Sequence, residues 1–146
     1  MRLVRLADAK VSGYGDNPFS GIILEIENYA PDFSLIIETP SVKISTTDGK
    51  QQTPLFVFLV EILKGNVGLV ARETKLLKEE ISIGDASYKT FGPTNQMAVK
   101  MDEEGRANYV FREKSIIQLG FIFAEDRKNI NGLDFFGKPI DLSQTD

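Results

Sequence analysis

The sequence of 146 residues contains no cysteine and no histidine. Without cysteine the chain cannot form a disulfide bond, a thiolate metal site or a thiol nucleophile. Without histidine it lacks the commonest general base and the commonest ligand of transition metals. Serine–histidine–aspartate catalysis, two-histidine zinc helices and iron sites of two histidines and a carboxylate are therefore excluded. Since the remaining reactive side chains form no catalytic motif, we predict a protein that is not an enzyme and holds no cofactor.

Long apolar runs are also missing. The longest run, residues 54–60, is far shorter than the roughly 20 residues needed to span a bilayer. Near the N-terminus, Arg5 and Asp8 interrupt the apolar residues, whereas a signal peptide needs about 7 to 15 uninterrupted ones. We therefore predict no membrane insertion and a cytoplasmic location, or a secreted or periplasmic one if a leader has been removed.

Concentrated positive charge is absent as well. The 17 basic and 21 acidic residues give a formal net charge of −4 and are mixed along the chain. Proteins that follow a nucleic-acid backbone usually carry a basic face or arm. We therefore predict that nucleic acid is not a partner.

The sequence does contain many short apolar runs separated by turn-forming residues. Apolar residues make up 42% and charged residues 26%, as in ordinary globular domains, and no linker or repeat divides residues 1–146. Glycine, asparagine, aspartate and proline cluster about every 8 to 16 residues, with Ile, Val, Phe and Leu between the clusters. This spacing predicts one all-β domain, an antiparallel β-sandwich of about eight to ten strands with at most one short helical segment.

Two segments call for a closer reading: one for which strands pair with each other, and one for whether it forms a helix or strands. Residues 96–101 and 106–111 alternate between apolar and polar, and Gly105 lies in the turn between them, so they predict a β-hairpin. Residues 68–83 mix good helix formers with a β-branched end. They fit either two strands with a charged connection or a short helical turn near 72–79.

Residues 115–124 are apolar on both faces of a predicted strand, which favours a strand covered on both sides. The weaker face contains Gln118 and Gly120. We expect another part of the same domain to approach that face closely. One face comprises Ile117, Leu119, Phe121 and Phe123. The other, weaker face comprises Ile116, Gln118, Gly120 and Ile122.

Three stretches together resemble small bacterial immunoglobulin-like sandwich domains of secreted proteins and lipoproteins. They are a strand ending in IEN (26–28), the turn TTDGK (46–50), and FIFAEDRKNINGLDFF (121–136) followed by PIDL. The resemblance is to the type of the mycobacterial immunoprotective extracellular protein, and it covers residues 21–142 as a pattern of strands and turns. It implies an immunoglobulin-like antiparallel β-sandwich and transfers no functional residue. Those proteins carry export signals, and this chain shows none.

Acidic turns are the first candidate site, for Ca²⁺ or Mg²⁺. No EF-hand loop is present, and three consecutive residues at a strand-like tip cannot all face one ion. Aspartate and asparagine also favour turns because their side chains bond the nearby backbone. We therefore predict no metal site. The residues considered are Asp16, Asn17, Asp48, Asp102, Glu103 and Glu104.

A carboxylate pair and a glycine-rich loop are the next candidates. Glu25 and Glu27 lie about 7 Å apart on one strand, a separation suited to glycoside hydrolysis. They equally fit a solvent-facing stripe beside Ile22, Leu24 and Ile26, and the chain has no tryptophan and only four tyrosines as sugar platforms. No catalytic residue is predicted.

The glycine-rich loop 13–21 leads into a strand and not a helix, so it does not match a phosphate-binding loop. We expect its Tyr14 and Phe19 to pack back onto the domain.

The strand within residues 54–63 suggests a surface for a partner. Phe56 and Phe58 on one face fit a core. The opposite face carries Leu55, Val57 and Leu59, which need a cover, and exposed apolar patches usually mark interaction surfaces. We therefore predict a non-enzymatic protein-interaction or assembly module that uses an exposed strand face or edge, with a protein partner or a second copy. The alternative is a small-ligand or carbohydrate-binding β-sandwich.

Overall fold

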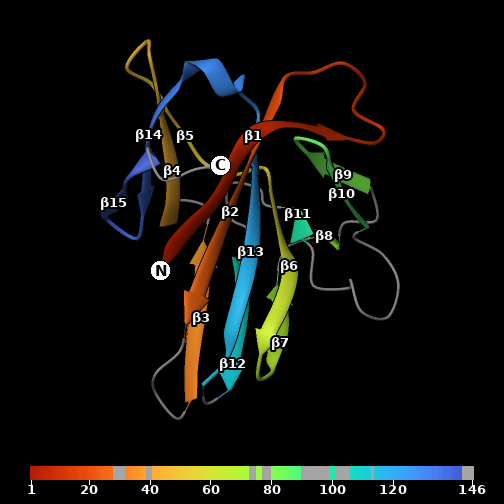
Figure 1. Ribbon diagram of the computed structural model, residues 1–146, viewed down its shortest axis with the longest axis vertical. Helices are drawn as coiled ribbons and strands as arrows, with labels where there is room; N and C mark the ends of the chain where they lie inside the picture. The colour runs from red at the N-terminus through yellow and green to blue at the C-terminus, as the bar shows by residue number, and fades with distance from the viewer. Residues whose placement is uncertain are drawn as a thin grey trace.

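The computed structural model shows a protein built from antiparallel β-sheets, and this confirms the all-β prediction (Figure 1). The strands are joined by turns, among them a 3-10 turn at Arg127–Asn129. The structure describes residues 1–27, 32–38, 41–72, 75–76, 80–89, 99–100, 106–112 and 114–142.

Sheet A has eight strands in the order β10-β9-β1-β2-β13-β6-β11-β8 and curls into a half-barrel. Its strands, in chain order, are β1 (Arg2–Val11), β2 (Phe19–Glu27), β6 (Phe56–Lys64), β8 (Lys75–Leu76), β9 (Glu80–Ile83), β10 (Ala86–Lys89), β11 (Val99–Lys100) and β13 (Ile116–Phe123).

Two smaller sheets lie against sheet A. Sheet B has the order β3-β12-β7, and sheet C has the order β15-β14-β4-β5. The described residues thus form fifteen strands, more than the eight to ten expected, because several are only two or three residues long. Sheet B consists of β3 (Asp32–Glu38), β7 (Val67–Arg72) and β12 (Arg106–Arg112). Sheet C consists of β4 (Val42–Thr46), β5 (Gln51–Gln52), β14 (Ile130–Phe135) and β15 (Lys138–Ile140).

The three central strands of sheet A are each followed or preceded in the chain by a strand of sheet B. The order is the same in both sheets: β2, β13 and β6 in one, and β3, β12 and β7 in the other. Glu27, Ile116 and Lys64 lie opposite one another, so all three connections leave sheet A at the same end. Sheet B therefore forms a second layer behind the lower part of sheet A (Figure 1).

A buried serine ties two of these connections together. Ser115 Oγ accepts a hydrogen bond from Asn66 N over 3.1 Å and donates one to Asn66 O over 2.8 Å. Gly65 has a φ of +79°, and a Cβ there would lie 2.8 Å from Ser115 Cα, so glycine suits both the backbone and the close approach. The β6–β7 turn and the start of β13 are thereby held side by side.

The core divides into two clusters, one on each face of β13. The first lies between sheet A and sheet C, and the second fills the curl of sheet A. Ile117, Leu119, Phe121 and Phe123 belong to the first and Ile122 to the second, which confirms the predicted division of this strand. The second cluster comprises Ala9, Val11, Phe19, Ile23, Phe56, Phe58, Ile81, Ile83 and Ile122.

Two glycines allow side chains to reach the inner surface of the curl. A Cβ on Gly120 would lie 2.9 Å from Phe58 Cε2 and closer still to Cζ and Cε1. A Cβ on Gly21 would lie 2.5 Å from Ile83 Cγ1. The ring of Phe58 therefore covers the Gly120 side of β13, as expected from the weaker face of that strand. Strand glycines commonly mark such close approaches.

The predicted hairpin of residues 96–101 and 106–111 is wrong. β11 pairs with β6 and β8 in sheet A, whereas β12 pairs with β3 and β7 in sheet B. Alternation identifies a strand and its faces but carries no information about its neighbours. Residues 96–98 and 101–105 lie outside the described residues.

The ambiguous residues 68–83 form strands wherever they are described. Their described parts belong to β7, β8 and β9. The short helical turn near 72–79 is not found in the described residues of that range, which are 72, 75 and 76; residues 73–74 and 77–79 lie outside the description. Pairing within sheets A and B, a tertiary interaction, overrides the local helix propensity here.

Replacing Gly120 with alanine should destabilise the protein by about 1 to 3 kcal/mol, because the new methyl group overlaps the buried ring of Phe58. Urea denaturation would measure this loss. Gly132→Ala is the matched control, since a Cβ there lies 3.3 Å from Ser45 Cβ. In a Phe58→Leu background the cost of Gly120→Ala should shrink. Equal losses at both glycines would contradict the proposed contact.

Candidate functional site

Two of the candidate metal-binding residues, Asn17 and Asp48, bond to the turns that contain them. Asn17 Nδ2 donates a hydrogen bond to Tyr14 O over 2.8 Å. Asp48 accepts hydrogen bonds from the hydroxyl of Thr46 and from Lys50 N, and these bonds lower the pKa of its carboxyl group. Within the part of the chain that the structure describes, no three acidic residues converge on a point that could hold a metal ion. Asp102, Glu103 and Glu104 lie outside that part.

Glu25 belongs to a polar row that crosses four strands of sheet A. The row contains Arg2, Glu25, Gln118 and Glu61 from β1, β2, β13 and β6. Arg2 Nη2 and Gln118 Nε2 each donate to Glu25 Oε1 over 3.2 Å. The hydrogen bond from Arg2, with a further contribution from Gln118, lowers the pKa of the Glu25 carboxyl group despite its partial burial. Glu25 is thus held as an ionised bridge between strands.

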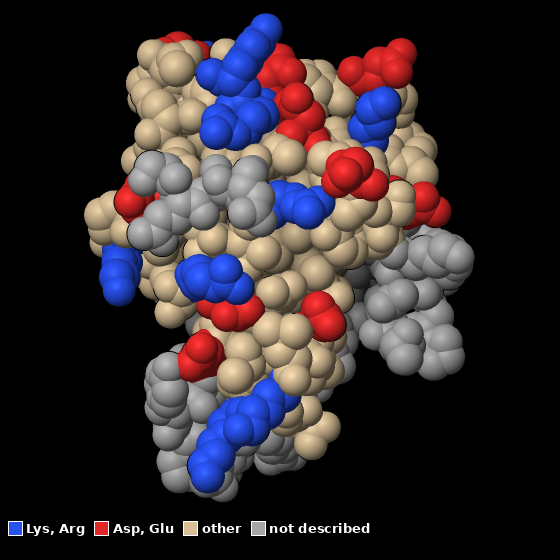
Figure 2. Space-filling view, viewed as in Figure 1, with Lys and Arg blue, Asp and Glu red and all other residues tan. Residues whose placement is uncertain are grey.

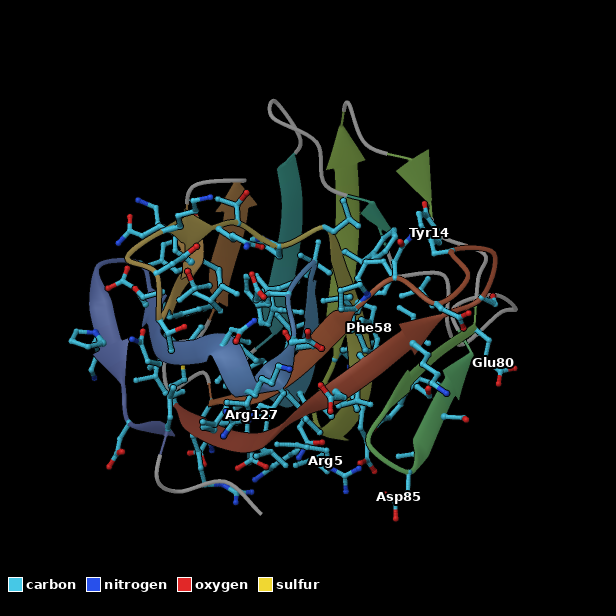
Figure 3. All side chains as sticks on the ribbon, turned by 90° about the horizontal axis from the view of Figure 1, so that it is seen from above. Arg5, Tyr14, Phe58, Glu80, Asp85 and Arg127 are labelled. Atoms are coloured by element: carbon cyan, nitrogen blue, oxygen red, sulfur yellow. The ribbon has the colours of Figure 1, made fainter. Side chains whose placement is uncertain are left out.

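The glycine-rich loop packs back onto the domain, as predicted. Gly13 and Gly15 have φ values of +84° and +63°, which turn the chain between β1 and β2. The Tyr14 ring meets Phe19 and Phe56 edge to face, with centroid separations of 6.0 and 5.4 Å. Figure 3 looks into the half-barrel and shows Phe58 inside it and Tyr14 beside this loop.

A polar cleft of about 510 Å³ lies between this loop and the outer face of β1, β9 and β10. Lys10, Ser82 and Ser87 lie opposite one another on the three strands and form its floor. Ser12 N donates to Glu80 O and Glu80 N donates to Ser12 Oγ, each over 2.9 Å, so the loop is fixed against β9. Exposed charges of both signs line the cleft, which suits a small polar ligand.

The sequence alone did not reveal this cleft. Its floor residues are up to 77 positions apart, and only the pairing of β1 with β9 and of β9 with β10 brings them together. The available signal was weak: polar residues alternate with apolar ones around Lys10, Ser82 and Ser87.

The predicted interaction face at Leu55, Val57 and Leu59 needs correction. Val57 has an exposed fraction of 0% and lies in the core between sheets A and C. Leu59 packs against that same core, and Leu55 packs against the core inside the curl. The chain itself supplies the cover that these residues need, because sheet C closes over this face of sheet A.

The exposed apolar residues of β6 are instead Ile62 and Leu63, with exposed fractions of 39% and 47%. β11 pairs with β6 only at Phe56 and Val57, so no described strand pairs with that side of the lower half of β6. We call residues 59–64 the open β6 edge. In Figure 1 this edge borders the lower part of sheet A, and β7, an outer strand of sheet B, follows it after a short turn.

The open β6 edge is irregular. Its register with β13 shifts twice, leaving Val60 and Leu63 as extra residues without an opposite partner on β13. Such bulges bend a strand and redirect its side chains, and they are common at sheet edges.

On the face of the molecule seen in Figure 2, acidic and basic side chains are interspersed without a continuous basic surface.

The Glu25 bridge should make stability depend on acid pH. Because the folded pKa of Glu25 is lowered, its contribution is present above the unfolded pKa of about 4.3 and is lost as pH falls through the folded pKa. Glu25→Gln should cost about 0.5 to 1 kcal/mol at neutral pH and less in acid. Denaturation across an acid pH series would measure how far the free energies of unfolding of wild type and Glu25→Gln approach each other as the pH falls. Glu61→Gln is the control from the same row, and an identical pH profile for both variants would refute the bridge.

Two features of the described residues are suited to contact with another molecule: the open β6 edge and the polar cleft. No helix in those residues is long and apolar enough to cross a membrane. Neither a protein-family model, nor a curated protein, nor a solved structure matches this chain.

Proposed function

We propose that this protein is a non-enzymatic protein-interaction or assembly module that binds its partner along the open β6 edge. The observation that carries the proposal is the exposure of Ile62 and Leu63 on a stretch of β6 where no described strand pairs with the outer side. An unpaired strand edge offers backbone donors and acceptors, and its apolar side chains add affinity.

The other exposed apolar residues are less suited to this role. Among the described residues these are Met1, at the N-terminus, and Phe136, in a hairpin turn of sheet C. Each stands alone in the sequence, whereas Ile62 and Leu63 are adjacent. Fully burying an aliphatic side chain stabilises a complex by about 1.5 to 3 kcal/mol, so this half-exposed pair contributes a useful part of that.

An immunoglobulin-like antiparallel β-sandwich is part of the same proposal. The matching order of β2, β13 and β6 with β3, β12 and β7 supports a two-layered arrangement. In such an arrangement the layers end together where β6 and β7 run down one side. A partner strand placed there extends one sheet without disturbing either core.

The double variant Ile62→Thr, Leu63→Thr should weaken partner binding about tenfold or more, because it removes apolar contact area while keeping strand propensity. Quantitative affinity purification from the cells that make the protein would compare wild type and variant. Phe136→Asn is the matched control: it removes an equally exposed apolar residue on sheet C, and asparagine tolerates the φ of +54° there.

A set of proteins retained by wild type and by Phe136→Asn, and lost from the double variant, would support the proposal. Thermal unfolding should show that the double variant keeps the wild-type melting temperature to within a few degrees, since surface changes cost about 0.5 kcal/mol or less. Retention of the same proteins by all three chains would overturn the role of this edge.

The polar cleft favours a second candidate function, the binding of a small polar ligand. Three hydroxyl side chains, Lys10 and two carboxylates surround it, and hydroxyl and charged groups fix the orientation of ligands such as sugars or amino acids. None of the described residues that line the cleft is aromatic, whereas sugar sites usually offer an aromatic stacking platform. This places the cleft second to the open β6 edge.

A ligand of the cleft should raise the melting temperature of wild type but not of Ser82→Arg, whose long side chain occupies the cleft floor. At a concentration about 100 times its Kd, such a ligand adds about 2.7 kcal/mol to the free energy of unfolding. A thermal-shift screen of sugars, polyols and amino acids would measure this. The double variant at Ile62 and Leu63 is the control and should respond like wild type. An equal response of Ser82→Arg would rule out the cleft.

A further inference from the structure

We infer that the partner of the open β6 edge is a second copy of this chain, paired with it antiparallel across a two-fold axis. This inference rests on the proposed function. The exposed tip of the edge reads Glu61-Ile62-Leu63-Lys64, and this order of side chains is complementary to itself when reversed. A two-fold contact requires such self-complementarity, because each surface meets its own copy.

The register follows from the side chains. An axis between Ile62 and Leu63 places each Ile62 opposite Leu63 of the second copy. The same axis places each Glu61 opposite Lys64 of the second copy. The extra residue Leu63 puts Glu61 and Lys64 on one face of the sheet, since they lie opposite Gln118 and Ile116 of β13, so the two can form ion pairs on either side of the apolar residues. Centring the axis on Ile62 or on Leu63 would instead set a charged residue opposite an apolar one. The charges therefore select one register.

Glu61 and Lys64 are available for these pairs. Both are exposed, and neither takes part in any of the ion pairs found among the described residues. Those three ion pairs are Arg2–Glu25, Arg5–Asp85 and Lys50–Asp48.

Two outer strands, β3 and β15, fit a second copy less well. A two-fold pairing of β3 centred on its own midpoint would set Asp32 opposite Glu38, and opposed like charges are destabilising. β15 contains Pro139, which cannot donate a ladder hydrogen bond. The β6 tip combines apolar residues with charges that attract their own reversed copy.

The two bulges of β6 set the strength of the contact. They interrupt a regular backbone ladder, so side chains carry most of the contact. A contact made by Glu61, Ile62, Leu63 and Lys64 of each copy is far smaller than the roughly 20 to 30 residues a side of a stable interface, so it belongs to the weak, transient class. We therefore expect association that grows from micromolar to millimolar protein, with the mean mass rising from 16.3 kDa towards twice that value.

Charge reversal tests both the partner and the register. Glu61→Lys and Lys64→Glu should each weaken self-association about tenfold, because each replaces two attractions with two repulsions. The double variant Glu61→Lys, Lys64→Glu should associate like wild type. An equimolar mixture of the two single variants should form a mixed dimer, since the attractions then reappear across it. Sedimentation velocity at low salt would measure all of these, with thermal unfolding to show that each chain is folded.

A wild-type protein that stays monomeric at millimolar concentration would overturn the inference. So would a double variant, or a mixture of single variants, that fails to regain association. These results leave the proposed function standing if Ile62→Thr, Leu63→Thr still loses a different protein in affinity purification. If wild type does not self-associate and the variant Ile62→Thr, Leu63→Thr loses no protein, the open β6 edge has no role in binding.

Discussion

The burial of β13 on both faces is the constraint on which the rest of the structure depends. Residues such as Phe121 and Ile122 face opposite ways and are both fully buried. One sheet cannot cover both faces of its own central strand unless it curls, so sheet A folds around one side and sheet C closes the other. The curl in turn needs glycine at Gly120 and Gly21, where Phe58 and Ile83 reach the backbone. The two buried clusters and the two glycines therefore have the same cause, which is the need to cover both faces of β13.

In the described residues, the strand that pairs with the outer side of β6 ends before β6 does, and the exposed apolar residues of β6 lie beyond it. Phe56, Val57 and Phe58 are buried, and exposure rises along the strand towards Lys64. As far as it is described, β11 pairs with the first part of β6 alone. The turn at Gly65 and the Ser115 hydrogen bonds nevertheless fix the far end of the strand against β13. An exposed apolar segment that is held in place at both ends loses little conformational freedom on binding.

The sequence predicted strands and their faces well because alternation is a local property. It placed both faces of residues 116–123 and the packing of Tyr14 and Phe19 correctly. It could not predict which strands pair, since pairing joins residues far apart, and the hairpin expected for β11 and β12 failed for that reason. The uncovered face expected at Leu55, Val57 and Leu59 is not found, because these residues pack against the two cores, and the exposed apolar residues of the strand, Ile62 and Leu63, lie further along it.

The same limits explain why neither candidate site was visible in the sequence. Ile62 and Leu63 read as a continuation of a core strand, and their exposure appears only in the folded chain, where the described part of β11 pairs with β6 at Phe56 and Val57. The cleft arises from strands β1, β9 and β10, which meet only in the folded chain. An open apolar edge is also a hazard, since it can pair with any extended chain. Two bulges and the flanking Glu61 and Lys64 restrict that pairing, and in the proposed contact with a second copy the same features define the register.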